Sequence, residues 1–419
     1  MTPAVAVPPG AAPHGSPTHA AVAEVVRGSY GRLLAYLASG TGDIAAAEDA
    51  LADALLAALR TWPERGVPAR PDSWLVTVAR RNLVDVSRRR ATATRALPQL
   101  ALLAPPGGDP SVGSGIPDVR LQLMFACTHP AVAEPVRSPL MLQTVLGLDA
   151  ARIASVFLVP TATMAQRLVR AKTKIRTAGI PFAVPPDEVL PARLGAVLDA
   201  VYAAYTAGWD PPVDPATDQT PGPDLAGEAV RLAGLLVDLV PDHAEAHGLL
   251  ALLLHCEARR PARRTPAGAF VPLDQQDTRL WSRGSMARAE EHLARALPLG
   301  DVGPYQLMAA VQSVHNRRAA TGRTDHAAVE ALYEGLVHVS PTTGVRVAHA
   351  AAVSAAGDPA RALHLLDGLA DRGQGYQPYW VARSSVLDRL DRRVEAAGAR
   401  ATAVSLTTDD AVRAHLTGR

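Results

Sequence analysis

The stretch at residues 146–176 constrains the fold of this chain most, because its pattern predicts two helices joined by a tight turn. The expected helices cover about residues 149–157 and 161–175, and Pro160 and Thr161 favour a helix start at the second of them. In that second helix, apolar residues recur at steps of four, three and four, so they share one buried face. These residues are Met164, Leu168, Ala171 and Ile175.

The opposite side of this second helix is cationic, and positions 150–178 contain no Asp or Glu. A helix with one apolar and one cationic side, entered through a short turn, is typical of the second helix of a helix-turn-helix. A basic amphipathic helix on any protein surface is the alternative, and for this stretch alone it is the better interpretation. At about 100° per residue the cationic side carries Thr163, Gln166, Arg167, Arg170 and Lys174.

Composition favours a helical protein. Ala, Leu, Arg and Val dominate, and aromatic residues, which favour strands, make up 4% of the 419 residues. Cys127 and Cys256 are too few for a disulfide framework, and no apolar run has the length of a membrane span. The first arginine is Arg27, so a charged amino-terminal signal region is missing. We therefore expect a soluble cytoplasmic protein of two or three domains, without a membrane partner.

The net charge of +2 is unevenly distributed along the chain. Residues 21–178 carry 19 Arg and Lys against 12 Asp and Glu, whereas the rest carries 23 against 28. A basic amino-terminal part suits a polyanionic partner, and the remainder does not.

Two helices are expected before the first proline-rich loop. Residues 1–20 contain Pro, Ala, Gly and His but no Asp, Glu, Lys or Arg, so they should form a disordered tail. One helix should cover about residues 21–37. A second should begin at Asp43 and bury Ile44, Leu51, Leu55 and Leu59. This arrangement leaves Glu48, Asp49 and Asp53 free to face outward.

A third helix is expected from Ser73, after the loop at residues 63–73. Leu75, Val78, Ala79, Leu83 and Val86 face one way, Thr77, Arg81 and Arg88 the other, and Arg80 lies at the edge. The arginines at 88–90 close the helix, where cations also interact favourably with the helix dipole. Positions 80–95 contain six arginines and one Asp, which is more positive charge than interaction with the helix dipole explains. This excess favours a nucleic-acid contact over a basic face that is merely solvated.

The order of these segments resembles bacterial RNA polymerase sigma factors of the extracytoplasmic-function (ECF) class. The resemblance rests on AEDALADALLAALRTWP, SWLVTVARRNLVDVSRRR, a linker and the two helices at 149–175. The stretch from RLQLMFACTHPAV through FLVPTATMAQRLVRAKTKIRTAGIPFAVP is similar to the ECF subgroup with a long C-terminal, TPR-like extension. The resemblance implies an all-α fold, with a tail at 1–20, sigma-2 at 21–92, a linker at 93–117, a sigma-4 helix-turn-helix domain at 118–178 and a TPR-like helical domain at 186–419.

The resemblance also implies partners, namely core RNA polymerase and promoter DNA. Glu48, Asp49 and Asp53 would bind the polymerase core, although a solvated acidic face explains them as well. The loop at 63–73 and the third helix would engage the −10 element, where stacking and pocket contacts can hold bases outside the duplex. The −10 residues would be Trp74, Thr77, Arg80, Arg81, Arg88, Arg89 and Arg90.

The helix at 161–175 would contact the −35 element. Residues at the start of such a helix reach base edges, and later ones reach phosphates. Lys172 projects off the main polar face and is the least well placed of the phosphate contacts. The base contacts would be Thr161, Thr163, Gln166 and Arg167, and the phosphate contacts Arg170, Lys172, Lys174 and Arg176.

The C-terminal half should consist of helices, near residues 191–207, 224–240, 243–257, 284–297 and 303–319. Near its end the chain repeats itself with a period of 34 residues, which is the TPR period. We therefore expect a helical-hairpin domain that binds a protein partner or covers the sigma domains. The matched pairs are Ala348 with Ala382, Val353 with Leu387, and Ala362 with Ala396.

Other chemistry has little support in the sequence. Cys127 with His129, and His255 with Cys256, lack the paired spacing of a zinc site, and neither pair has an orienting acid nearby. We therefore expect no metal, no cofactor and no enzymatic activity. The leading hypothesis is a sigma factor that binds core RNA polymerase and directs transcription initiation. The alternative is a helical-repeat protein-interaction or ligand-sensing regulator without sigma activity.

Overall fold

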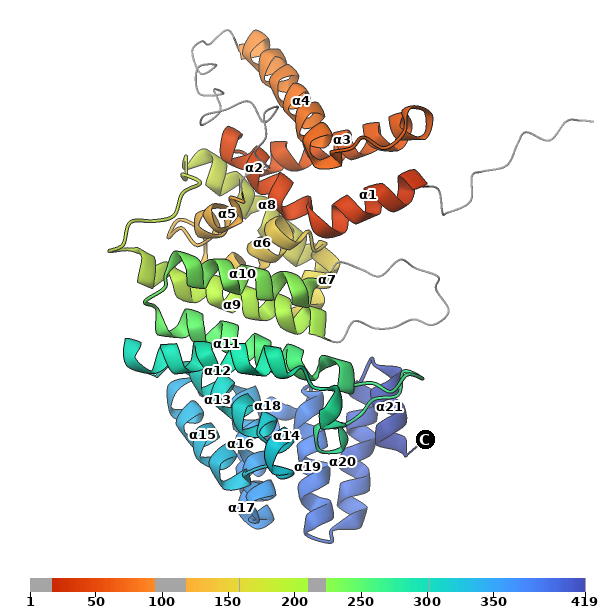
Figure 1. The fold of residues 1–419 in the computed structure, drawn as a ribbon, viewed down its shortest axis with the longest axis vertical. Helices are drawn as coiled ribbons and strands as arrows, with labels where there is room; N and C mark the ends of the chain where they lie inside the picture. Colours follow the sequence, from red (N-terminus) through yellow and green to blue (C-terminus); the bar gives the residue numbers. More distant parts are fainter. Residues whose placement is uncertain (1–16, 95–117, 158, 210–223, 301, 419) are drawn as a thin grey trace, which may run out of the picture. The chain divides into compact units, whose positions relative to one another are not determined.

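The computed structural model describes residues 17–94, 118–157, 159–209, 224–300 and 302–418, without the side chains of residues 17, 27, 86–94 and 156. Within these ranges every regular element is a helix, apart from one isolated β-bridge between Arg264 and Phe270 (Figure 1). The all-α fold expected from the sequence is therefore confirmed. The described residues fall into two compact units, one of residues 17–209 and 224–229 and one of residues 230–418.

The first unit is built from nine helices and the start of a tenth. Most of the expected tail and linker, residues 1–16 and 95–117, lie outside the described part of the chain. The helices are α1 (Pro17–Gly28), α2 (Tyr30–Thr41), α3 (Ile44–Arg65), α4 (Pro71–Thr94), α5 (Arg120–Cys127), α6 (Glu134–Leu146), α7 (Ala150–Val156), α8 (Thr161–Thr177), α9 (Leu190–Trp209) and the first turns of α10 (Leu225–Leu239).

The core of the first unit depends on a close approach between α2 and α6. Leu33, Leu34 and Leu37 of α2 are buried, as are Leu140 and Val145 of α6. Gly31 permits this packing, because a Cβ built there would lie only 1.7 Å from the carbonyl oxygen of Val145. The helices that precede residues 95–117 and those that follow them are therefore packed into one compact unit.

The amino-terminal helix differs from the expected one. The sequence predicted a single helix over residues 21–37, whereas the structure has α1 and α2 with a break at Ser29. The Ser29 hydroxyl donates a hydrogen bond of 2.9 Å to Asp72 at the start of α4, and Arg32 forms an ion pair with the same carboxylate. These contacts come from a segment more than 40 residues away, so helical periodicity alone could not predict the break.

The first unit also extends beyond residue 178, where the sequence placed the end of sigma-4. Leu194, Val197 and Val201 of α9 are fully buried, and α9 packs against α5 and α6. Arg193 donates a 3.1 Å hydrogen bond to the hydroxyl of Thr128 and another to the carbonyl oxygen of Phe125. The apolar face of α9 thus completes the core of the first unit, and α9 does not belong to the separate domain expected from residue 186.

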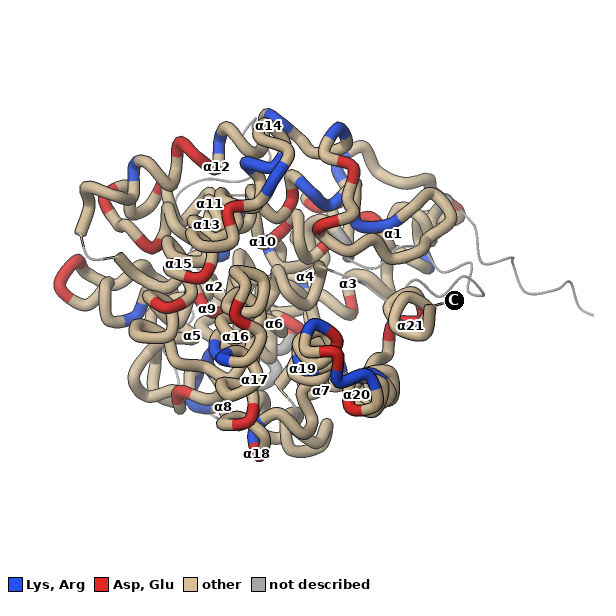
Figure 2. Tube along the Cα trace, turned by 90° about the horizontal axis from the view of Figure 1, so that it is seen from below, with Lys and Arg blue, Asp and Glu red and all other residues tan. Residues whose placement is uncertain are grey.

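The second unit is a succession of helices whose first members match the expected positions closely. Basic and acidic residues both occur along α12 and α20 (Figure 2). The elements are the rest of α10, α11 (Ala244–Arg259), α12 (Arg283–Ala296), α13 (Pro304–Asn316), α14 (Arg318–Thr321), α15 (His326–Val339), α16 (Thr343–Ala356), α17 (Pro359–Asp367), α18 (Ala370–Gly373), α19 (Gln377–Arg389), α20 (Arg393–Leu406) and α21 (Asp410–Thr417).

The 34-residue repeat corresponds to two helix pairs, α16 with α17 and α19 with α20. Both helices of the second pair begin 34 residues after their counterparts in the first. Val353 and Leu387 occupy equivalent buried positions, and Ala362 and Ala396 are both fully buried where paired helices meet. Small residues at these positions let the helices of each pair approach closely.

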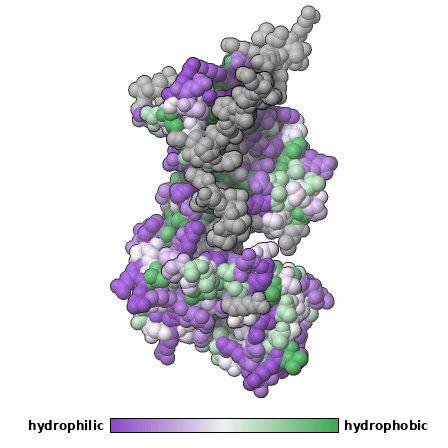
Figure 3. Space-filling view, turned by 90° about the vertical axis from the view of Figure 1, so that its right-hand side faces the viewer, coloured by the Kyte–Doolittle hydropathy of each residue, from purple (hydrophilic) through white to green (hydrophobic). Residues whose placement is uncertain are grey.

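The surface carries apolar and hydrophilic residues side by side on the face shown in Figure 3. Among the described helices, none has both the length and the apolar character that crossing a membrane requires.

Replacing Gly31 by Ala should destabilise the first unit by about 3 kcal/mol or more, because the new methyl group would collide with backbone at Val145. Gly40→Ala on the same helix is the matched control, since a Cβ there meets nothing within 4 Å. It should be neutral or stabilise the protein slightly. Urea unfolding followed by circular dichroism measures both changes. Equal stability of the two variants would show that the close approach of α2 and α6 is absent in solution.

Candidate nucleic-acid interface

The helix α8 has the two faces that the sequence predicted. Met164, Leu168, Ala171 and Ile175 are buried, which confirms the apolar stripe. Asp149 accepts a 2.8 Å hydrogen bond from the backbone of Arg152 and so caps α7, which precedes α8 across a short turn. On the other side of α8 Thr163 is half-buried, and Thr161, Gln166, Arg167, Arg170 and Lys174 are exposed.

The exposed cations of α8 are not neutralised within the described part of the chain. Arg167, Arg170 and Lys174 form no ion pair with any described residue, and α8 itself carries no acidic residue. They also border an apolar groove of about 520 Å³, whose lining includes Val132, which precedes α6, and Val136 in the first turn of α6. An exposed cationic row on one helix can contact a run of phosphates.

One edge of α8 is occupied by acidic residues of α3. The Nζ atom of Lys172 lies 2.6 Å from Oε2 of Glu48, and Nη1 of Arg176 lies 3.4 Å from Oδ2 of Asp43. The sequence assigned Glu48 to the polymerase and Lys172 and Arg176 to phosphates, whereas the structure pairs Lys172 with Glu48 and Arg176 with Asp43. Burial raises the pKa of Glu48, and the hydrogen bond from Lys172 opposes that rise.

The expected outward orientation of Glu48 is therefore wrong, while Asp49 and Asp53 are exposed as expected. Glu48 follows Ile44 by four residues and precedes Leu51 by three, so it lies beside the buried stripe of α3.

Small residues also form more of that stripe than expected: Ala47, Ala50, Ala54 and Ala58 are buried, whereas Leu55 and Leu59 are half-buried.

The helix α4 holds the residues that the sequence assigned to the −10 element. Trp74 is half-buried and packs edge-on against Trp62, with 5.5 Å between the ring centroids. Arg80 donates a hydrogen bond to the Tyr36 hydroxyl and lies over that ring, so it is partly engaged inside the protein. Thr77 and Arg81 are exposed. Arg88, Arg89 and Arg90 lie on α4, but their side chains are outside the described residues.

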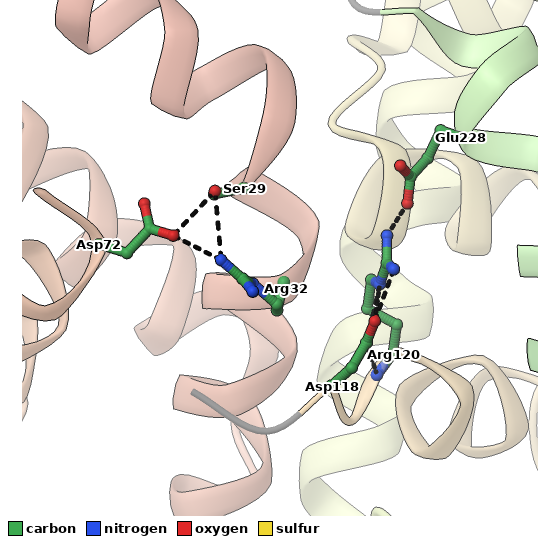
Figure 4. Close-up of polar contacts among 6 residues, drawn as sticks. All are labelled: Ser29, Arg32, Asp72, Asp118, Arg120 and Glu228. Atoms are coloured by element: carbon green, nitrogen blue, oxygen red, sulfur yellow. Dashed lines mark hydrogen bonds and ion pairs between the residues drawn. The ribbon is translucent and has the colours of Figure 1, made fainter. Parts of the chain in front are cut away.

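A cavity of about 520 Å³ lies between α1, the loop after α3 and the start of α4. Its lining mixes charged and apolar residues, with Arg32 and Arg70 beside the carboxylates of Glu24 and Asp72 and beside Val67. Asp72 fixes this region by accepting hydrogen bonds from Ser29 and Arg32 (Figure 4). The loop predicted to engage DNA therefore borders a preformed hollow.

A buried arginine joins the start of α5 to α10. Arg120 is 8% exposed and lies between Asp118 and Glu228, with ion pairs to both (Figure 4). Burial alone would raise the pKa of Asp118, but hydrogen bonds from Arg120 lower it. Sequence reasoning missed this cluster, because Arg120 and Glu228 lie far apart in the chain and carry no local motif.

The cysteines and their histidine neighbours lie in packed surroundings. Burial raises the pKa of the Cys127 thiol to about 12, and its sulfur lies 3.9 Å from the Thr144 hydroxyl. Burial lowers the pKa of His255 to about 4, and Asn316 contacts its Nδ1 at 3.0 Å. Within the described ranges, no group of three or more His, Cys, Asp or Glu side chains is arranged to hold a metal ion.

Comparison with known proteins gives two domain matches and a relative that is similar over most of the chain. Residues 25–93, from α1 to α4, match sigma-70 region 2, and residues 193–297, from α9 through α12, match a family of unknown function, DUF6596. The chain is 36% identical over 376 residues to the uncharacterized protein R00370 of Rhizobium meliloti (strain 1021). The aligned region covers 88% of each chain. No solved structure matches the chain.

Replacing Glu228 by Gln should destabilise the first unit by about 2 kcal/mol, because it leaves the buried Arg120 with one anionic partner instead of two. Glu64→Gln is the control, since Glu64 is exposed on α3 and should change stability by less than about 0.5 kcal/mol. Calorimetric unfolding measures both variants. Identical unfolding temperatures would contradict the structural role of the Arg120 cluster.

The stability of the second unit should fall as the pH is lowered from 7 towards 4. The pKa of His255 is 6.5 when unfolded and about 4 when folded, so unfolding takes up a proton in this interval. We expect a loss of about 1–3 kcal/mol from this group. His255→Gln should be less stable at pH 7 but less sensitive to acid. An unchanged pH dependence of urea unfolding in this variant would exclude His255 as the cause.

Proposed function

We propose that the chain is a sigma factor of the sigma-70 family, because it carries a sigma-70 region 2 domain at residues 25–93. It belongs to one family with the uncharacterized rhizobial protein R00370, which is 36% identical over 88% of each chain. In this proposal it binds core RNA polymerase, recognises promoter DNA and directs transcription initiation. The ECF class is the subgroup that fits the order of its segments.

The single observation that carries the proposal is the exposed cationic face of α8 in the same compact unit as region 2. With α7 it forms the helix-turn-helix that would contact the −35 element. Its amino-terminal residues would contact base edges, and exposure of Thr161, Gln166 and Arg167 in the first two turns supports this role. Arg170 and Lys174 continue the same face and would contact phosphates.

The −10 element would meet α4 and the loop that precedes it. Thr77 and Arg81 are exposed on α4, and Arg70 and Ser73 border the cavity beside that loop. The lining also includes Glu24 and Asp72, so the hollow offers both hydrogen-bond donors and acceptors to a base held outside the duplex. Trp74 serves mainly as packing in this arrangement, because it contacts Trp62.

The acidic residues Asp49 and Asp53 are exposed on α3 and would contact the core polymerase. Glu48 completes that face only when its contact with Lys172 is broken. The second unit, with its TPR-like helix pairs, would bind a protein partner that modulates activity. Such pairs also suit the alternative of an interaction or ligand-sensing protein without sigma activity, and a pull-down of core polymerase separates the two.

Arg167→Ala should weaken binding of the reconstituted holoenzyme to its promoter fragments by about tenfold, because one base-edge contact is lost. Association with core polymerase should be unchanged. Arg372→Ala is the control, since it removes one exposed arginine from the second unit. Gel-shift titration against fragments selected from genomic DNA measures the affinity. Equal affinities of the two variants, or loss of core association in Arg167→Ala, would contradict the assignment.

A further inference from the structure

We propose that Tyr36 of α2 is a positioning residue that holds the guanidinium group of Arg80 in place for a DNA phosphate beside the −10 element. This inference rests on the proposed function, because it adds a supporting residue to the contact between α4 and DNA described there. Arg80 lies on α4, whereas Tyr36 lies 44 residues earlier in the chain. The pair is called the Tyr36–Arg80 contact below.

Tyr36 holds Arg80 by two interactions at once. The Cζ atom of Arg80 lies 4.9 Å from the centroid of the Tyr36 ring, which is within the range of a cation–π interaction. Nη2 of Arg80 also donates a hydrogen bond to the Tyr36 hydroxyl. The ring and the hydroxyl together restrict the position and the rotation of a guanidinium group that a free surface arginine would sample widely.

The ring of Tyr36 is a firm support, because it belongs to the packed part of α2. The adjacent residues Ala35 and Leu37 are buried, and so is Leu33 one turn earlier. Tyr36 itself is half-buried, so its ring lies at the edge of this core. A tyrosine side chain has only two torsions to fix, which makes it a rigid contact. The position of Arg80 is therefore set by the core of the first unit.

The Tyr36–Arg80 contact leaves most of the guanidinium group available to a ligand. An arginine has five N–H donors, and the Tyr36 hydroxyl accepts from one of those of Arg80. Arg80 is half-buried and forms no ion pair with any residue that the structure describes. On the same helix Thr77, one turn earlier, and Arg81 are exposed. Arg80 thus lies at the border of an exposed polar surface of α4.

The ligand that fits this arrangement is a phosphate. A guanidinium group binds phosphate oxygens through paired N–H donors, and the charges are opposite. A side chain that is already fixed loses less rotational freedom when the phosphate binds, so the support of Tyr36 favours the contact. The alternative is a purely structural contact that only joins α2 to α4. The two roles differ in whether loss of Tyr36 changes DNA binding.

Removal of the ring tests the support directly. We would reconstitute holoenzyme from core polymerase and the full chain, and titrate it against promoter fragments selected from genomic DNA at several salt concentrations. Tyr36→Leu should weaken binding about fivefold and reduce the slope of log K against log salt by about 0.9, because one phosphate contact is lost. Tyr376→Leu is the matched control, since Tyr376 is 37% exposed in the second unit. Equal affinities and slopes of these two variants would overturn the proposal.

Tyr36→Phe keeps the ring and removes only the hydroxyl. Because the cation–π interaction remains, its affinity for the same fragments should stay within about twofold of that of the unaltered chain. Equal losses in Tyr36→Phe and Tyr36→Leu would contradict a support that depends on the ring.

A double-mutant cycle shows whether Tyr36 acts through Arg80. Arg80→Leu alone should lower the affinity at least as much as Tyr36→Leu, and the two substitutions together should lower it no further than Arg80→Leu. Additive losses would mean that Tyr36 affects DNA binding by another route, which refutes the proposal. An unchanged affinity of Arg80→Leu also refutes it, even where Tyr36→Leu does not fold.

Urea unfolding of the free chains separates stability from DNA binding. If Tyr36→Leu lowers the unfolding midpoint but leaves the affinity of the folded chain unchanged, the contact is only structural and the proposal is wrong. Failure of the unaltered chain to associate with core polymerase contradicts the proposed function itself. The same cycle is then run with the free chain and a mixed-sequence duplex of about 30 base pairs. There, unchanged salt slopes in both Tyr36→Leu and Arg80→Leu would exclude the phosphate contact.

Discussion

The close packing of α2 against α6 is the constraint on which the rest of the first unit depends. Gly31 allows the two backbones to meet, and no larger residue could occupy its place without moving Val145. Because of this contact, the region 2 helices and α5 to α8 form one body, in which α8 can reach α3. The same unit contains the ion pairs Lys172–Glu48 and Arg176–Asp43, the Arg120 cluster and the packed face of α9.

Local patterns predicted the helices well, because each helix buries one face of its own. The stripe Met164, Leu168, Ala171 and Ile175 follows from spacing alone, and Asp43 and Asp149 mark helix starts by their side-chain caps. The 34-residue repeat likewise gave the helix pairs of the second unit, since its period is a property of the sequence. The exposure of Arg167, Arg170 and Lys174 follows from the same periodicity.

The features that could not be predicted all depend on long-range contacts. The break at Ser29 comes from Asp72, the partner of Lys172 lies 124 residues away in α3, and α9 joins the first unit through Arg193 and its apolar face. Glu48 illustrates the limit best. Its helical position puts it between the buried and exposed sides of α3, and only the neighbouring helix decides whether it faces water or a lysine.

In the proposed function the chain is a promoter-specificity subunit of RNA polymerase. Transcription by core polymerase on genomic DNA, with and without the chain, tests this claim most directly when the 5′ ends are mapped. The account predicts that the chain adds new start sites, each preceded by the same two sequence elements at constant spacing. Start sites identical to those of core polymerase alone would contradict it.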